Sequence, residues 1–134
     1  MALPSREQDR RLGDYELLYE LKSGGMGSVF VGRKRGTGGF EKLVAIKTIL
    51  PELSGRAELR TMFLDEAQLL SRLEHPAVAQ VYDFGEQDQT LYLAMEYVQG
   101  VRFSDLIELA VPPATSARLI AETCRALHAA HELC

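Results

Sequence analysis

The stretch LKSGGMGSVFVG-RKRGTGGFEK-LVAIK occupies residues 21–47 of the chain. It predicts two strands around a glycine-rich turn, then a polar loop, then a third strand that ends in a lysine. Gly24, Gly25 and Gly27 lack the Cβ atoms that would keep a backbone away from a ligand. Backbone N–H groups in such a turn can point at phosphate oxygens. Because Lys47 adds a positive charge at the end of the third strand, the stretch predicts a clamp for a nucleotide.

The glycine turn alone leaves other interpretations open. A β-hairpin that needs positive φ angles would show the same glycines. A dinucleotide-binding turn requires a helix after the glycines, whereas the residues Ser28 to Val31 that follow here predict a strand. A phosphate loop of the nucleotide hydrolases requires Gly-Lys-Ser/Thr, which this sequence lacks. A strand on each side of the turn favours a flap over phosphates.

Composition sets limits on the class of protein. The chain has 134 residues, the length of one domain, and its 46% hydrophobic and 25% charged residues are ordinary for a globular protein. A formal net charge of −4 argues against a nucleic-acid partner. No apolar run approaches the roughly 18 residues that cross a bilayer, and the start lacks the apolar core of a signal peptide. With only Cys124 and Cys134, we expect a cytoplasmic protein without a disulfide framework or a membrane segment.

The hydrophobic pattern predicts an α+β fold with five antiparallel strands and one inserted helix. We expect a flexible tail over residues 1–12 and a first strand with Tyr15, Leu17, Tyr19 and Leu21 on one face. The expected strands cover residues 15–21, 28–31, 43–49, 78–84 and 90–98, with a polar turn at 86–89 between the last two. The expected helices cover residues 56–73, 104–109 and 114–134.

The last expected helix has an apolar stripe with little in the chain to cover it. We expect Ala117, Ile120, Cys124, Leu127 and His131 to form the inner stripe of this helix, with only the short helix at 104–109 to pack against it. An open apolar face of this kind favours association. We therefore expect association through the open face of helix 114–134.

Lys47 and Glu66 are the expected charged pair of the site. A strand lysine usually extends to solvent, and a helix glutamate is usually solvated. Here Lys47 lies among apolar strand residues, and Glu66 lies on an apolar helix stripe, three residues after Phe63 and four before Leu70. Two such buried charges would be costly unless they met each other. The sequence therefore predicts that Glu66 binds Lys47 and fixes its ammonium group for phosphate.

The glycine flap, the VAIK motif, the helix glutamate and the AMEYVQG motif occur in one order and spacing. Together they resemble the small lobe of a eukaryotic-like serine/threonine protein kinase of the bacterial kind. The resemblance extends from about Tyr15 to the end. It implies a kinase-like small lobe over residues 13–98 and the first two helices of the large lobe over residues 99–134.

The resemblance also implies roles for individual residues toward ATP and Mg²⁺. Lys47 would hold the α- and β-phosphates with Glu66 as its partner, and these two are the catalytic candidates. Met95 would be the gatekeeper, and Gly100 would begin the crossing to the large lobe. The expected nucleotide-binding residues are Leu21, Gly24, Gly25, Gly27, Val29, Ala45, Lys47, Met95, Glu96 and Val98, with the backbone of Glu96 and Val98 toward the adenine edge.

Two departures from the family pattern are visible. Lys22 stands where the family has its first flap glycine, and its side chain should stiffen the turn or approach the nucleotide. The catalytic loop, His-Arg-Asp followed by an asparagine, does not occur in the sequence. That Asp receives the substrate proton and the Asn helps hold magnesium. We therefore expect a protein serine/threonine kinase represented by its ATP-binding part, inactive as residues 1–134 alone, its protein substrate unknown. The alternatives are a truncated pseudokinase that binds nucleotide or a partner protein, and a plain α+β fold without nucleotide.

Two further patterns have structural interpretations. Asp83-Phe84-Gly85 spells the magnesium-binding triplet of kinases, but it precedes the expected hinge, so we interpret it as a strand end. His128 and His131 lie three apart on a helix without a second ligand pair nearby, which favours a helix surface over a metal site. We expect no metal ligand in this chain.

Overall fold

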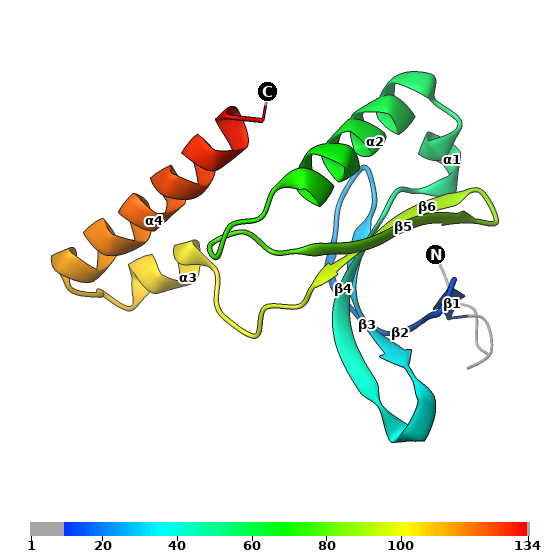
Figure 1. The fold of residues 1–134 in the computed structure, drawn as a ribbon, viewed down its shortest axis with the longest axis horizontal. Coiled ribbons are helices and arrows are strands. Elements are labelled where there is room, and N and C mark those ends of the chain that lie inside the picture. The colour runs from blue at the N-terminus through cyan, green and yellow to red at the C-terminus, as the bar shows by residue number, and fades with distance from the viewer. Residues whose placement is uncertain (1–9, 134) are drawn as a thin grey trace.

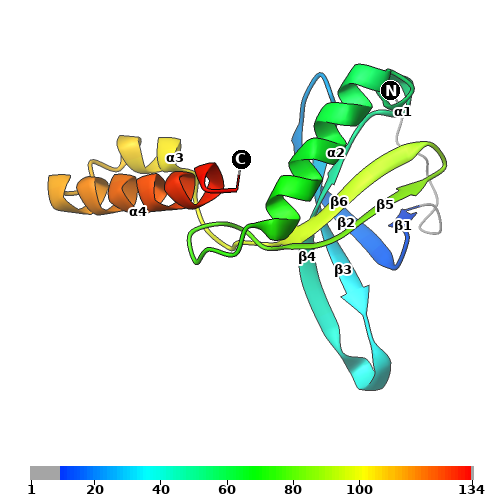
Figure 2. The same ribbon diagram turned by 45° about the horizontal axis from the view of Figure 1, so that its top comes forward.

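The computed structural model describes residues 10–133 of the chain. In this range a six-stranded antiparallel sheet, in the order β1-β2-β3-β4-β6-β5, carries helix α2 on one face (Figures 1 and 2). The strands are β1 (Arg11–Leu12), β2 (Tyr15–Ser23), β3 (Ser28–Arg35), β4 (Glu41–Thr48), β5 (Val81–Gln87) and β6 (Thr90–Glu96). The helices are η1 (Thr37–Gly39), α1 (Pro51–Ser54), α2 (Ala57–Arg72), α3 (Phe103–Glu108) and α4 (Pro113–His131). The predicted α+β fold is confirmed.

The sheet has one strand more than the five predicted. Arg11 and Leu12 pair with β2, and the Leu12 side chain is buried. The chain reverses at Gly13, whose φ of +55° suits glycine. The prediction of a tail is therefore wrong for residues 10–12, while residues 1–9 lie outside the described part of the chain.

The last two strands also meet differently from the prediction. The polar turn was expected over residues 86–89, but β5 extends to Gln87 and pairs with Thr90. Only Asp88 and Gln89 form the turn, with φ of +49° and +63°. Two central residues with positive φ match the twist of a tight hairpin.

The sheet separates two hydrophobic clusters, because alternate residues of a strand point to opposite faces. Val44 and Ile46 of β4 pack with Tyr15 and Tyr92 inside the curl of the sheet. Phe63 of α2 packs on the other face with a second set of buried residues, Ile49, Ala67, Leu91 and Leu93. Lys47 of β4 pairs with Val29 of β3 and with Leu93 of β6, and Leu93 belongs to the second set. Its side chain therefore lies on the face that α2 covers.

The edges of the curled sheet are joined by polar contacts. The Gly13 N–H donates to Gln87 Oε1 at 2.8 Å, and Gln87 Nε2 donates to the Arg11 carbonyl at 3.1 Å. The Tyr15 hydroxyl lies 3.4 Å from Asp83 Oδ2. These bonds link β1 and β2 to β5, which stands at the opposite end of the strand order.

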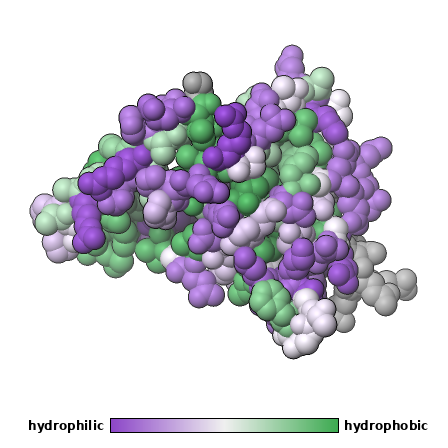
Figure 3. Space-filling view, in the orientation of Figure 1, coloured by the Kyte–Doolittle hydropathy of each residue, from purple (hydrophilic) through white to green (hydrophobic). Residues whose placement is uncertain are grey.

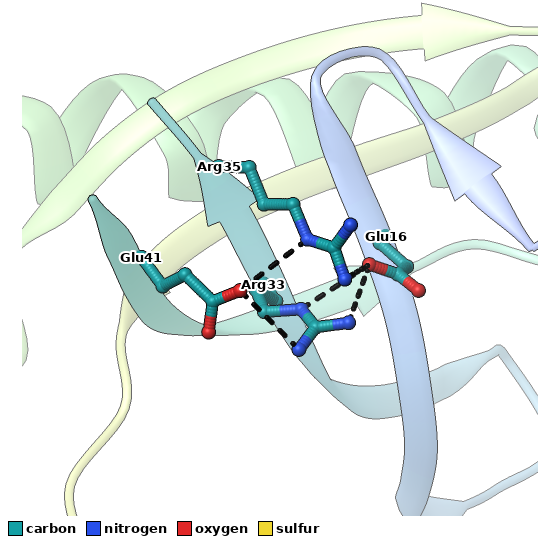
Figure 4. Close-up of polar contacts among 4 residues, drawn as sticks. All are labelled: Glu16, Arg33, Arg35 and Glu41. Atoms are coloured by element: carbon teal, nitrogen blue, oxygen red, sulfur yellow. Dashed lines mark hydrogen bonds and ion pairs between the residues drawn. The ribbon is translucent and has the colours of Figure 1, made fainter. Parts of the chain in front are cut away.

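A network of charged side chains crosses the first three long strands (Figure 4). Arg33 Nη2 lies 2.9 Å from Glu16 Oε2, and Arg33 Nη1 lies 3.6 Å from Glu41 Oε1. Arg35 contacts the same two carboxylates at 3.7 and 3.4 Å. The hydrogen bond from Arg33, together with its charge, holds the pKa of the Glu16 carboxyl below its usual value. The network joins β2, β3 and β4 away from the cavity described below.

Two irregularities change which face the β2 side chains occupy. Leu17 pairs with Gly32 but Tyr19 with Val31, and Glu20 pairs with Phe30 but Lys22 with Val29. Each step inserts one extra residue into β2, which is a β-bulge. The predicted single face of β2 is therefore wrong: the Tyr15 side chain is 2% exposed, whereas Tyr19 is 53% exposed.

Helices α3 and α4 stand beside the sheet and connect to it through residues 97–102 (Figures 1 and 2). The buried residue of α4 is Ala126, while Ile120, Cys124 and Leu127 are exposed. The predicted stripe is therefore the open face of α4 and not its inner one. Figure 3 shows hydrophobic surface among hydrophilic side chains over this part of the molecule. Within residues 10–133, no helix is long and apolar enough to cross a membrane.

Candidate nucleotide site

The glycine loop between β2 and β3 is attached to the end of β4. The Gly24 N–H donates to the Gly27 carbonyl at 2.9 Å and closes the loop. The Leu50 N–H donates to the Met26 carbonyl at 3.0 Å, so the pairing of β3 with β4 continues before the start of β3 and after the end of β4. One limb of the loop is therefore held by the sheet.

Residue 27 must be glycine because the backbone at Thr48 passes close to it. A Cβ on Gly27 would lie 1.9 Å from the Thr48 carbonyl oxygen, too close for any side chain. A Cβ on Gly24 would make only an ordinary contact of 3.8 Å, and one on Gly25 would meet nothing within 4 Å. Of the three predicted glycines, Gly27 is thus needed to attach the loop, whereas Gly24 and Gly25 leave its tip open.

Lys47 and Glu66 form the predicted pair. Lys47 Nζ donates to Glu66 Oε1 at 2.7 Å and to Oε2 at 2.8 Å. Glu66 is placed there because Phe63 and Ala67 bury the same side of α2 against the sheet. The Lys47 ammonium also lies 5.8 Å from the centre of the Phe63 ring. The expectation that both charges are buried is wrong, since the two side chains are 36% and 43% exposed.

A cavity of about 380 Å³ lies between the glycine loop, the end of β4 and α2. Its walls include Gly24, Gly25, Gly27, Val29, Lys47 and Glu66 from the predicted site. Charged groups on its walls are Lys22, Lys47 and Glu66, and the rest of the lining is mainly apolar. The cavity thus presents backbone amides and ammonium groups beside an apolar wall, a combination suited to a ligand with phosphates.

Some lining residues are absent from the sequence-based site. Met26, Thr48, Ile49, Leu59 and Met62 line the cavity together with Phe63. For Met62 a signal existed: it precedes Glu66 by four residues and so shares its side of the helix. Thr48 and Ile49 were not predictable in this way, because the loop reaches them through backbone contacts.

The predicted adenine contacts lie outside this cavity. Ala45 is 8% exposed and pairs across the sheet with Met95 and Val31, which places it on the face of Lys47. Leu21 and Val98 are exposed. The cavity lining does not include these residues.

Glu96 has a backbone partner already. Its N–H donates to the Gln80 carbonyl at 2.8 Å, and its Oε2 accepts from the Gln80 N–H at 3.2 Å. The adenine contact expected from Glu96 therefore remains a prediction.

The sequence patterns that imitate metal sites have other roles. Asp83 lies within β5, where Oδ1 accepts from the Phe84 N–H at 2.8 Å and Oδ2 faces Tyr15. Over residues 10–133, no group of three His, Cys, Asp or Glu side chains could hold a metal ion.

The fold agrees with comparisons to known proteins. The family model described as "Protein kinase domain" matches residues 15–134. The chain belongs to the protein kinase domain family. The predicted kinase-like small lobe followed by the start of the large lobe is thereby confirmed.

Individual relatives are bacterial kinases. The chain is 37% identical over 126 residues to the tyrosine-protein kinase MasK of Myxococcus xanthus, covering 90% of this chain and 20% of MasK. It is 34% identical over 138 residues to the serine/threonine-protein kinase PknB of Mycobacterium tuberculosis, covering 98% of this chain and 21% of PknB. The chain thus spans about a fifth of the length of these relatives.

Solved structures give the same result for the fold. The crystal structure of the PknI kinase domain of Mycobacterium tuberculosis superposes with a TM-score of 0.72 at 28% identity. That match covers 91% of this chain and 50% of the PknI domain. The chain therefore corresponds to about half of a kinase domain.

Proposed function

We propose that this chain is the ATP-binding part of a serine/threonine protein kinase, which transfers the γ-phosphoryl group of ATP to protein serine or threonine. The observation that carries the proposal is the pair of hydrogen bonds from Lys47 Nζ to both Glu66 oxygens on the wall of the cavity under the glycine loop. In protein kinases such a pair must be in place for phosphoryl transfer. Residues 13–98 would form the nucleotide-binding lobe and residues 99–134 the beginning of the large lobe.

The residues of the chain divide the work of holding the nucleotide. The backbone N–H of Gly25 at the loop tip would face phosphate oxygens, since a Cβ there would meet nothing within 4 Å, while the Gly24 N–H closes the loop on the Gly27 carbonyl. Lys47 would hold phosphate with its orientation fixed by Glu66. Val29 and Ala45, on the same face as Lys47, would contact the adenine ring together with Leu21, Met95, Glu96 and Val98. Mg²⁺ would enter bound to the phosphates, because the described residues offer it no cluster of ligands.

Relatives bear on the residue that accepts phosphate. PknB and Pkn2 are named serine/threonine-protein kinases, whereas MasK is named a tyrosine-protein kinase. The serine/threonine assignment therefore follows several relatives but not all. A cytoplasmic location is part of the proposal, because ATP is available there.

The test uses the whole protein as its gene encodes it, incubated with Mg-ATP and a basic protein substrate, with phosphosites identified by mass spectrometry. We expect phosphoserine and phosphothreonine, and we expect Lys47→Met to abolish them. Asp83→Asn is the matched control, since Asp83 lies in β5 outside the cavity. Phosphotyrosine alone would overturn the serine/threonine assignment, and transfer that persists in Lys47→Met would overturn the site.

Residues 1–134 by themselves are proposed to bind ATP without transferring phosphate, since the sequence has no His-Arg-Asp motif. A rise in melting temperature with ATP, without phosphate incorporation, is the expected result. A plain α+β fold would show no rise with ATP. Incorporation that is lost in Lys47→Ala would contradict the inactivity of residues 1–134.

A further inference from the structure

Lys22 stands in a row of side chains that runs across three strands toward Lys47. Lys22 pairs with Val29, and Val29 pairs with Lys47. Residues directly opposite each other in antiparallel strands present their side chains on the same face. With strands about 4.8 Å apart, the two lysine Cα atoms are separated by roughly 10 Å along this row.

The bulge in β2 is what brings Lys22 to this face. Before it, Glu20 pairs with Phe30, whose side chain packs against the cluster inside the curl of the sheet. In a regular strand Lys22 would occupy the same face as Glu20, two residues away. The extra residue, Leu21, shifts the register by one, so Lys22 pairs with Val29 and lines the cavity. A bulge that redirects one side chain is a common device beside binding sites.

The charged side chains on the cavity wall do not all have a partner of opposite charge. Both oxygens of Glu66 are bound to Lys47 Nζ, so these two charges offset each other. Glu20, the nearest carboxylate along β2, accepts a hydrogen bond from Ser28 Oγ. Among residues 10–133, Lys22 forms no side-chain hydrogen bond or ion pair with another residue. Its ammonium group is therefore available to an anion in the cavity.

The base of the loop holds Lys22 in register while the tip stays open. Ser23 pairs with Ser28, and the Gly24 N–H closes the loop onto the Gly27 carbonyl. Lys22 is thus anchored in an ordered ladder and lines the cavity, three residues before Gly25 at the open tip of the loop. A polyphosphate across the loop would have Lys47 on one side and Lys22 on the other.

We propose that Lys22 is a second phosphate-binding cation, which makes the cavity select nucleoside di- and triphosphates over adenosine. The inference rests on the proposed function, because it assumes that a nucleotide occupies this cavity. The inference adds a claim of its own to the proposed function. Lys22 stands where kinases of this family carry glycine, and its charge contributes to ATP affinity beyond any stiffening of the turn.

The test compares the affinities of the whole protein for ATP, ADP and adenosine by calorimetry, in wild type and in Lys22→Met and Lys22→Arg variants. Lys22→Met should weaken ATP roughly fivefold, the size expected of one exposed charge contact, and leave adenosine unchanged. Lys22→Arg should retain most of the ATP affinity. The loss in Lys22→Met should shrink as salt is raised, since salt screens exposed charges. Lys34→Met, which removes the same charge from the outer part of β3, should bind all three ligands like wild type.

The outcomes separate the inference from the function on which it rests. Equal ATP affinity in wild type and Lys22→Met would overturn the role of Lys22 while leaving the nucleotide site intact. An equal loss for ATP and adenosine would mean that Lys22 acts on the loop structure, and would also overturn it. If wild type bound none of the three ligands, the proposed function would fail and the inference with it.

Discussion

Lys47 Nζ lies 2.7 Å from Glu66 Oε1 and 2.8 Å from Glu66 Oε2, which joins the end of β4 to the middle of α2. Because the side chains are 36% and 43% exposed, the pair contributes about 1 kcal/mol or less to stability. Its value is geometric: it holds one ammonium group on the cavity wall at a defined position. Substitutions at the pair should therefore affect phosphoryl transfer more than folding.

We expect Lys47→Met to lower kcat/KM on the order of 100-fold, as when a group that stabilises transition-state charge is removed. Glu66→Gln should lower it roughly tenfold, because the lysine remains but is less well oriented. The double variant should be no worse than Lys47→Met, since the glutamate acts only through the lysine. Single-turnover kinetics on the whole protein measure this. Additive losses in the double variant would contradict the orienting role of Glu66.

Gly27 and Gly25 provide a matched pair within one loop. Gly27→Ala would place a Cβ 1.9 Å from the Thr48 carbonyl oxygen, so the loop must move off the end of β4. We expect a loss of stability of about 1–3 kcal/mol, the usual range for overpacking, and weaker ATP binding. Gly25→Ala meets nothing within 4 Å and has no positive φ, so it should fold like wild type. Chemical denaturation with and without ATP gives both quantities, and equal stability of the two variants would refute the close approach at Gly27.

Much of this site was predictable because two periodicities were clear. The spacing of Phe63, Glu66 and Leu70 placed a carboxylate on an apolar helix face, and the only strand cation with apolar neighbours in the preceding hairpin was Lys47. A charge on an apolar face requires a partner, so the pair followed from sequence alone. What could not be read was its exposure, because the cavity beside the pair depends on how closely the glycine loop approaches α2.

The path of β2 and the rotation of α4 were beyond the sequence for a common reason. Bulges at Leu18 and Leu21 leave no mark in composition, yet each moves all later side chains to the other face. Helix α4 has alanines around most of its circumference, so its hydrophobic pattern does not determine which face turns inward. Contacts with neighbouring elements decide this, and they bury Ala126 while leaving Leu127 exposed.

Tyr15 should make stability depend on alkaline pH. Burial, and then the nearby Asp83 carboxylate, raises the pKa of Tyr15 from 10.0 to about 12. The folded protein thus keeps the phenol proton over a range in which the unfolded chain loses it. The contribution is complete below pH 10 and is lost as the pH rises from about 10 to 12.

Denaturation midpoints measured between pH 9 and pH 12 test this dependence. Tyr15→Phe should flatten the fall in stability, although not completely, because burial also raises the pKa of Tyr92. Asp83→Asn should give an intermediate slope, since burial of Tyr15 remains when the carboxylate charge is removed. An unchanged slope in Tyr15→Phe would show that this phenol does not carry the effect.

The last prediction concerns how α2, and with it Glu66, is held on the sheet. Arg60 on α2 and Glu86 on β5 are joined by two hydrogen bonds, of 3.2 and 2.7 Å. The Arg60 hydrogen bond holds the pKa of the Glu86 carboxyl below its usual 4.5. The stability that this pair adds is therefore present above pH 4.5 and is lost as the pH falls through the lower, folded pKa.

A double-mutant cycle with Arg60→Met and Glu86→Gln isolates this contact. Each single variant should lower the denaturation midpoint slightly, and the double variant should match the worse of the two, because the pair is one interaction. The coupling should shrink as salt is raised, since both side chains are exposed to solvent. Glu58→Gln, on the same helix but without this partner, is the control for loss of charge. ATP affinity measured on the same variants then shows whether α2 needs this second attachment to hold Glu66 against Lys47. If the coupling energy were zero and the ATP affinity unchanged, the Arg60–Glu86 pair would have no role in placing α2. The Lys47–Glu66 pair and the apolar contacts of Phe63 would then position this helix.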